Sequence, residues 1–190
     1  MLELLIFCVL SSFSYFAAGQ IFLNKTLHFH IDPIISIVFG ILILGFMGIF
    51  LNFFFPLNLF INTFVFFGLF FYFFWDLYKN KINIKKLLLN ILAISAITSI
   101  ILFLSNINRP DAGLYHLPFT KLLNESKIIL GSSNIHFRFG HTSLIQYSNA
   151  FNFNILFKEK GILIPQGLLI VSIIYYFGTK IFKYNKKKID

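Results

Sequence analysis

The sequence has little charge and a single cysteine. Only 12% of its 190 residues are charged, 57% are hydrophobic, and the mean hydropathy is +0.80. This balance excludes a water-soluble globular domain, in which about 25% of residues are charged. One cysteine, Cys8, excludes an intramolecular disulfide, a thiolate metal cluster and a redox pair. The composition therefore predicts a multi-pass membrane protein.

Acidic residues are scarce as well. Seven Asp and Glu residues stand against 16 Lys and Arg residues, which gives a net charge of +9. In a soluble protein this excess would suggest nucleic acid as a partner. Here the lysines cluster at the ends of hydrophobic segments, where anionic lipid headgroups and the insertion machinery favour them. We therefore expect contact with membrane lipid and no nucleic-acid binding.

Long hydrophobic runs are what the sequence has in abundance. A helix needs roughly 20 apolar residues to cross a hydrocarbon core about 30 Å thick. Five runs fit, at 2–23, 33–54, from the turn at 56–58 to 75, 87–104 and 161–182. Glu3, in place of a basic start, argues that the first run is a retained helix and not a cleaved signal peptide. We expect an all-α integral membrane protein with about five transmembrane helices and a long outer loop carrying short interfacial helices.

Lysine positions predict the orientation. Lysines at 79–86 and 180–188 flank the third, fourth and fifth runs, and the positive-inside bias places both segments in the cytoplasm. Five crossings then put the segment 105–160 outside. The expected organisation is a four-helix region at 1–104, a periplasmic loop with the candidate site at 105–160, and a fifth helix with a cytoplasmic tail at 161–190. The expected location is a bacterial inner membrane.

The outer segment has its own helical patterns. A short helical patch is expected at about 112–124. A second patch, at about 142–158, has Leu144, Tyr147, Phe151 and Ile155 at helical spacing, with Thr142 or Ser143 as the N-cap. We expect it to lie along the membrane surface, either beside a lipid-linked substrate or as a simple connector.

The first group of candidate residues follows the fourth run. Asp111 comes after Pro110 in a turn at the expected membrane boundary. Its carboxylate could serve as a general base or as one ligand of a divalent cation on a phosphate-bearing donor. It could equally be the N-cap of the next helix. His116 lies five residues further on, where a packed histidine is the alternative to a catalytic one.

The second group lies in NIHFRFGH, at 134–141. An extended backbone would place His136 and Arg138 on one face, where they could grip a phosphate. Alternatively, Arg138 meets only lipid phosphates. A zinc site from His116, His136 and His141 is disfavoured, because the offset of five between the last two suits neither one helix face nor one strand face.

Together the two groups carry a resemblance. DAGLYHLPF, followed some 20 residues later by GSSNIHFRFGHTS, resembles an uncharacterised family of bacterial polytopic membrane proteins with D-x-GLYH and N-[LI]-H-x-R elements, similar in layout to GT-C glycosyltransferases. The resemblance covers 108–143. It implies an outer loop whose first acidic residue acts as base or metal ligand. The residues that match its elements are Asp111, Tyr115, His116, Asn134, His136 and Arg138; where the pattern has Phe and Asn, this chain has His141 and Thr142.

These observations give two functional expectations. The first is a GT-C-like glycosyltransferase that uses a polyprenyl-phosphate-linked sugar in envelope glycan synthesis, with Asp111 and His116 catalytic and Tyr115, Asn134, His136 and Arg138 binding substrate. No cofactor is specified beyond an optional divalent cation. GT-C enzymes have more crossings than five, so we expect an amino-terminal portion, completed by a second membrane chain. The alternative is a noncatalytic partner in an envelope polysaccharide complex. A transporter is least favoured, because no run has a central ionisable residue.

Overall fold

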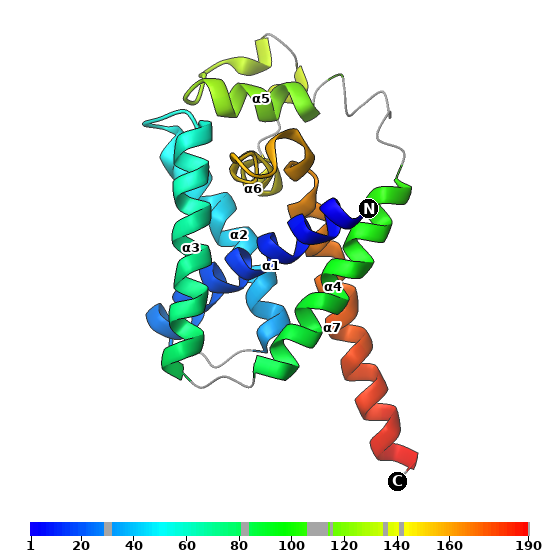
Figure 1. The fold of residues 1–190 in the computed structure, drawn as a ribbon. Helices are drawn as coiled ribbons and strands as arrows, with labels where there is room; N and C mark the ends of the chain where they lie inside the picture. The colour runs from blue at the N-terminus through cyan, green and yellow to red at the C-terminus, as the bar shows by residue number, and fades with distance from the viewer. Residues whose placement is uncertain are drawn as a thin grey trace.

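The chain is mostly helical in the part that the structure describes. The structure is a computed structural model, and it describes residues 1–28, 32–80, 84–105, 114, 116–134, 137–140 and 143–189. Within these ranges all regular elements are helices and there are no strands (Figure 1). Five of the helices are long and apolar enough to cross a membrane. The prediction of an all-α chain with five membrane-length helices is confirmed.

The bundle consists of five long helices, and side-chain caps mark the starts of two of them. They are α1 (Leu2–Gln20, continued by the π-helical turn η1, Ile21–Thr26), α2 (Pro33–Asn52), α3 (Leu59–Asn80), α4 (Ile84–Leu104) and α7 (Ile164–Ile189). The carboxylate of Asp32 accepts a hydrogen bond from Ile34 N–H at 3.1 Å, with Pro33 in the first turn of α2. The side chain of Asn58 accepts one from Ile61 N–H at 3.0 Å at the start of α3. These caps satisfy amide groups that a helix start leaves without partners.

Helix α1 is the centre of the fold. It contacts α2, α3, α4 and α7, and crosses the middle of Figure 1 diagonally from the end marked N. Two glycines set its closest approach, which is to α2: a Cβ added at Gly40 would lie 1.8 Å from Tyr15 O, and one added at Gly19 would lie 1.9 Å from Ser36 O. Small residues let membrane helices approach to backbone distance in this way. Glycine at both positions is thus a condition of the α1–α2 contact.

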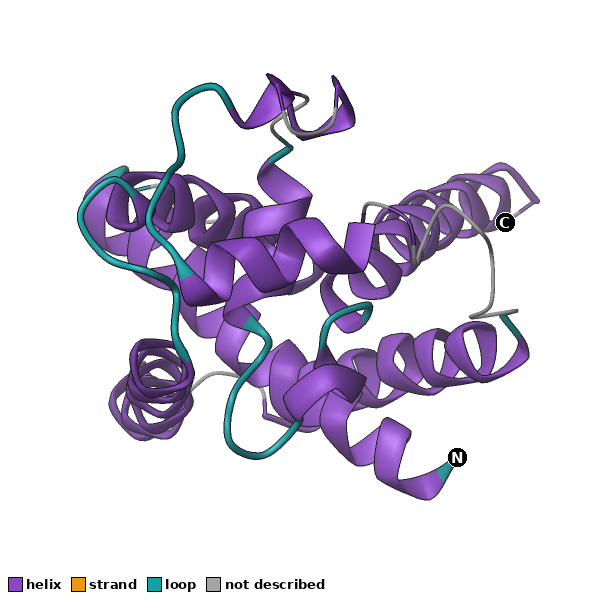
Figure 2. Ribbon diagram, turned by 90° about the horizontal axis from the view of Figure 1, so that it is seen from above, coloured by secondary structure: helices purple, strands orange, loops and turns teal. Residues whose placement is uncertain are grey.

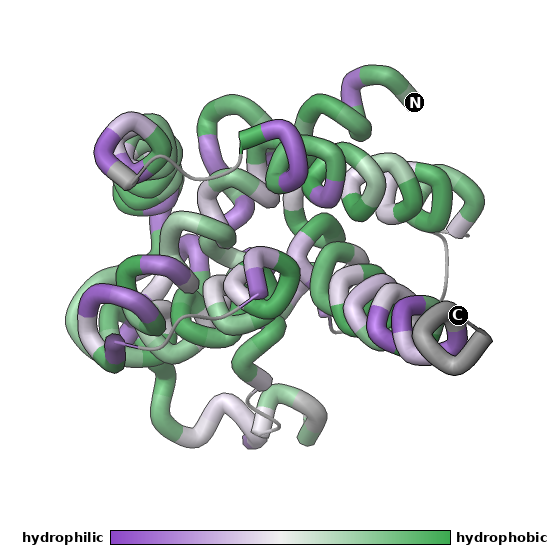
Figure 3. The backbone as a smooth tube through the Cα atoms, turned by 90° about the horizontal axis from the view of Figure 1, so that it is seen from below, coloured by the Kyte–Doolittle hydropathy of each residue, from purple (hydrophilic) through white to green (hydrophobic). Residues whose placement is uncertain are grey.

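Many large hydrophobic side chains point out of the bundle. Phe60 and Phe64 on α3 are 83% and 81% exposed. Seen from below in Figure 3, the tube is largely coloured hydrophobic along the long helices. Water would penalise such a surface, whereas lipid tails would not. The exposed faces therefore agree with a membrane environment.

A cap of shorter elements covers one end of the bundle, called here the α5 end. It contains α5 (Leu117–Glu125), α6 (Leu144–Phe151) and the 3-10 turns η3 (Ser132–Asn134), η4 (Phe137–Gly140) and η5 (Lys158–Gly161). Figure 1 shows α6 tucked between α5 and the long helices, and Figure 2, seen from above, shows α5 lying across the bundle. The C-terminal ends of α3 and α7 lie at the other end of the bundle, away from α5 (Figure 1).

The expectation of a surface-lying helix at 142–158 is wrong. Helix α6 ends at Phe151, and Tyr147 and Phe151 are buried against Gly48 of α2. Ile155, expected on the same stripe, lies beyond the helix and is 54% exposed. The apolar repeat at 144–151 packs into protein because α2 presents glycines that leave room for it. Ser143 does precede the helix as its N-cap, although its side chain makes no capping hydrogen bond.

Buried asparagines attach this cap to the long helices. The Asn62 amide on α3 donates to Leu57 O at 2.7 Å and to Ala150 O and Phe153 O at 2.9 Å each. Asn52 at the end of α2 does the same for the stretch after α5, with a bond to Ser126 O at 3.0 Å. Irregular backbone at this depth needs such donors, because it has few neighbouring waters. The asparagines thus fix where the cap sits.

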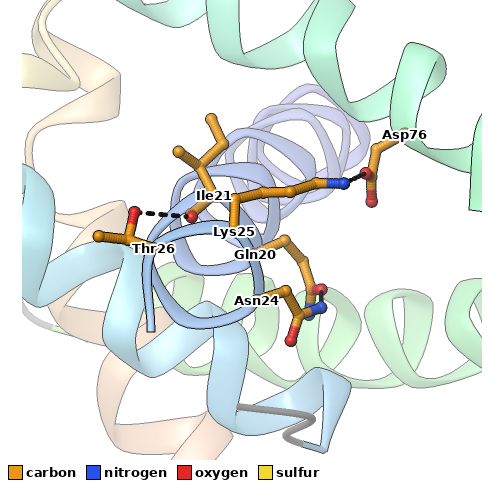
Figure 4. Close-up of polar contacts among 6 residues, drawn as sticks. All are labelled: Gln20, Ile21, Asn24, Lys25, Thr26 and Asp76. Atoms are coloured by element: carbon orange, nitrogen blue, oxygen red, sulfur yellow. Dashed lines mark hydrogen bonds and ion pairs between the residues drawn. The ribbon is translucent and has the colours of Figure 1, made fainter. Parts of the chain in front are cut away.

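A polar cluster joins the helices at the opposite end (Figure 4). Lys25 in η1 lies 3.9 Å from the carboxylate of Asp76 on α3. Gln20 donates to Ser36 Oγ at 2.6 Å and accepts a hydrogen bond from Asn24. The third helix was expected to end near 75 but continues to 80, so Asp76 is inside the helix and only 4% exposed. An ionisable group of this kind near a helix end was missed by the sequence reading.

Candidate functional site

A cavity of about 1340 Å³ lies at the α5 end. Its walls come from the first turns of α1, the last turn of α4, α5, α6 and the start of α7. One part of the wall is apolar, with Leu4 and Phe7 on α1 and Leu102 and Phe103 on α4. Segments far apart in the chain thus meet around one space, which is large enough for a lipid-linked headgroup and part of its chain.

The other part of the wall is polar and carries both signs of charge. Lys160 Nζ donates to the two carboxylate oxygens of Glu3, at 2.8 and 3.0 Å, across the cavity wall. Lys121 lies 3.7 Å from Glu125, one turn along α5. His116, just before α5, also lines the space. The cavity therefore offers an apolar surface next to ammonium and imidazole groups, a combination suited to an amphiphile with a phosphate.

The turn that carries Lys160 is held tightly in place. The Asn152 amide donates to Gly161 O at 2.8 Å, and Asn154 Oδ1 accepts from Phe157 N–H at 3.1 Å. A Cβ on Gly161 would lie 2.4 Å from Asn152 O, so the close approach requires glycine. The ring of Phe157, which is buried, lies 4.7 Å from that of Phe7 on α1. The backbones of both ion-pair partners are thus positioned by packing.

Helix α6 presents a neutral wall behind the cavity. Burial raises the pKa of Tyr147, so its phenol stays protonated and packs as an uncharged ring. Ser148 donates to Ile41 O at 2.6 Å, which ties α6 to the backbone of α2. Gln146 and Asn149, on the other side of the helix, line the cavity. These amides are groups that could bond a sugar hydroxyl.

The candidate residues from the sequence are only partly described. Asp111, Tyr115 and His136 lie outside the described residues, and so does the side chain of Arg138. His116 lines the cavity. Asn134 is exposed at the end of η3 and is not among the described residues of the cavity wall. Of the six predicted residues, His116 is placed at the cavity and Asn134 outside its described wall; whether the other four converge on the cavity stays a prediction.

The extended backbone expected at 136–139 is wrong for its described part. Phe137–Gly140 forms the 3-10 turn η4, in which alternate side chains do not share a face. The Ser132 hydroxyl donates to Phe139 O at 3.3 Å, and the Phe139 ring lies 5.6 Å from that of Phe119 on α5. No strand among the described residues is available to pair with this segment, so turns satisfy its backbone instead.

Sequence reasoning missed the residues that line the cavity with charge. Glu3 was weighed only as evidence about a signal peptide, and Lys160 was not among the candidate residues. Their partnership joins positions 157 apart, which no local pattern reveals. A possible signal was the placement of opposite charges at the outer ends of the first and fifth runs. No three His, Cys, Asp or Glu side chains gather as a metal site within the described part of the chain.

Comparison with known proteins assigns the chain to a family. The sequence profile of DUF8201, described as a domain of unknown function, matches residues 1–190. The chain belongs to the DUF8201 family. No curated protein and no solved structure matches it. The DUF8201 description states no activity, so the cavity at the α5 end is the feature that bears most directly on function.

Proposed function

We propose that this DUF8201 chain is a GT-C-like glycosyltransferase of the bacterial inner membrane, or the amino-terminal part of one. It takes a sugar from a polyprenyl-phosphate-linked donor and passes it to an envelope glycan or lipid. The observation that supports the proposal most is the cavity at the α5 end, with an apolar wall from α1 and α4 beside the polar residues His116 and Lys160. A polyprenyl chain matches the first wall, and a phosphate-linked sugar matches the second.

The position of the cavity supports the proposed side of the membrane. The last turn of α3 carries Lys79, and the end of α7 carries the lysine-rich tail; both lie opposite α5 (Figure 1). The positive-inside bias favours a cytoplasmic location for that end. The cavity would then open at the periplasmic face, where lipid-linked sugar donors of this class are used.

The proposed chemistry uses the motif residues. Asp111 deprotonates the acceptor hydroxyl or helps to bind a divalent cation, and His116 hydrogen-bonds the reacting groups from the cavity wall. Arg138 and His136 offset the negative charge that develops on the departing lipid phosphate. Tyr115 and Asn134 complete the substrate contacts in this scheme. The roles of the undescribed side chains rest on the resemblance of the two sequence elements.

Transfer in reconstituted liposomes tests the proposal. The chain is reconstituted with a radiolabelled polyprenyl-phosphate sugar and an acceptor lipid, alone and with membrane chains encoded next to it. Wild-type protein is expected to transfer label, and Asp111→Asn to lose transfer while still inserting. Asp32→Asn, which keeps the cap of α2 at the opposite end, is the matched control and should stay active. Undiminished turnover in Asp111→Asn would remove the proposed role of Asp111.

The alternative is a noncatalytic partner of an envelope polysaccharide complex. The observation in its favour is the exposed aromatic face of α3, with Phe60, Phe64 and Phe71 at 83%, 81% and 66% exposure, which could pack against another membrane chain. Replacing these three by Leu should then abolish co-purification with that chain without unfolding the protein. Sugar transfer by the purified chain alone would contradict this alternative.

A further inference from the structure

The Glu3–Lys160 ion pair differs from the other charge pair on the cavity wall. It connects the first turn of α1 to the turn before α7, positions that are 157 residues apart. The Lys121–Glu125 pair links residues within one turn of α5. The Glu3–Lys160 contact is tertiary and joins two walls of the cavity. Lys160 is therefore a cavity cation whose direction is set by the fold.

The surroundings of the pair contain the second element of an amphiphile site. Leu4 and Phe7 continue along α1 from Glu3 and line the same cavity. A hydrocarbon chain lying on these side chains would bring its terminal phosphate close to the Lys160 ammonium. The Lys160 turn cannot easily retreat, because Gly161 is packed against the backbone of Asn152. The geometry thus fits a phosphate at the position that the Glu3 carboxylate occupies.

Exchange of the carboxylate for a phosphate is physically reasonable. The side chains of Lys160 and Glu3 are 65% and 57% exposed, and exposed ion pairs contribute little to stability. The phosphodiester of the sugar-linked donor carries a single negative charge, as a carboxylate does, and the phosphate monoester that remains once the sugar has left carries about −1.5 to −2 at neutral pH. Phosphate oxygens also form strong charge-assisted hydrogen bonds with an ammonium group. A lipid phosphate would therefore displace Glu3 from Lys160.

We infer that Lys160 binds the phosphate of the lipid-linked donor and that Glu3 is the carboxylate this phosphate displaces. The inference rests on the proposed function and names a phosphate-binding residue for it outside both sequence elements. It gives the two residues opposite effects. Removing the charge of Lys160 weakens binding, whereas removing that of Glu3 frees the ammonium and strengthens binding.

Binding to the purified full-length chain in detergent tests the inference. The probes are polyprenyl phosphate, phosphatidylglycerol and inorganic phosphate, measured by microscale thermophoresis. Lys160→Gln should weaken polyprenyl phosphate binding about tenfold or more, as expected for loss of a charge-assisted hydrogen bond. Glu3→Gln should tighten it about two- to fivefold, and the double variant should match Lys160→Gln. Lys127→Gln, at an exposed lysine just after α5 and outside the cavity wall, is the matched control, with less than about a twofold change, and Lys160→Arg should retain binding.

The outcomes separate the two levels of the proposal. If wild-type protein binds polyprenyl phosphate but Lys160→Gln and Lys127→Gln are alike, the assignment of Lys160 is wrong while the proposed function stands. If the wild type binds no polyprenyl phosphate, the proposed function fails too. Equal Lys160-dependent binding of phosphatidylglycerol or of inorganic phosphate would overturn the polyprenyl donor as the source of the phosphate. Circular dichroism and unfolding temperature show whether each variant is folded.

Discussion

Replacing Asn62 by leucine tests how the cap is attached to the long helices. The two side chains have nearly the same shape, so Asn62→Leu removes the amide without opening a cavity. In the structure this amide on α3 donates to Leu57 O at 2.7 Å and to Ala150 O and Phe153 O at 2.9 Å. The substitution therefore removes two hydrogen bonds between α3 and the residues around α6, and one to the turn before α3.

The expected loss of stability depends on which hydrogen-bond donors each carbonyl keeps after the substitution. Ala150 O still accepts from Phe153 N–H at 3.1 Å, so it loses only one of two bonds. Phe153 is half-buried, so water can replace its lost donor. Leu57 is fully buried, but its carbonyl also accepts from the Asn124 amide nitrogen at 2.8 Å and so keeps a donor. At about 0.5–1.5 kcal/mol for each of three partly compensated bonds, we expect a loss of about 1.5–4.5 kcal/mol.

The assay is reversible unfolding in mixed micelles of a mild detergent and dodecyl sulfate. The free energy of unfolding of Asn62→Leu is compared with that of wild type and of Phe64→Leu, a substitution two residues along α3 on its exposed face. Phe64→Leu should change stability by less than about 0.5 kcal/mol. A stability of Asn62→Leu equal to that of wild type would refute the idea that buried amides hold the cap.

Three further predictions concern helix packing, an ion pair and the side of the membrane that η3 faces. Gly45→Ala should destabilise the protein by about 1–3 kcal/mol, because the added Cβ would lie 2.5 Å from the backbone of α6. Gly68→Ala, which has open space around it, should be neutral or slightly stabilising. Equal effects of the two substitutions on stability would contradict the α2–α6 contact. Asp76→Asn should destabilise the protein by about 1–3 kcal/mol, and this loss should be much smaller when Lys25→Gln is already present. Purely additive changes in stability would contradict coupling between Asp76 and Lys25. In a cysteine-free background, Ser133→Cys, exposed on η3, should react with an impermeant thiol reagent from the periplasm; labelling only from the cytoplasm would reverse the orientation.

The long helices could be predicted because their signals are local. Apolar length and end charges are read within one segment, and Pro33 and Asn58 mark helix starts directly in the sequence. Ends were less certain, as the continuation of α3 through Asp76 shows. Its charge reads as a loop residue until a partner, Lys25, is seen beside it.

The cap and the cavity could not be predicted, because their causes are tertiary. The apolar stripe that contains Tyr147 and Phe151 has the same period whether it faces lipid or protein. The glycines of α2 determine that it packs against protein. The Glu3–Lys160 pair depends on the contact between the first turn of α1 and the turn before α7. His116 was found by its motif, and the cavity gives it a location.

Photocrosslinking of a polyprenyl phosphate tests the central claim most directly. A photoreactive benzoyl-phenylalanine is introduced in place of Leu102, on the apolar wall of the cavity, and in place of Phe64, on the exposed face of α3. Irradiation in liposomes that contain a small fraction of polyprenyl phosphate is followed by mass spectrometry of the intact chain. The account predicts a polyprenyl phosphate adduct at position 102 and only bulk phospholipid adducts at position 64. Adducts of the same lipid composition at both positions would contradict a polyprenyl phosphate site in the cavity.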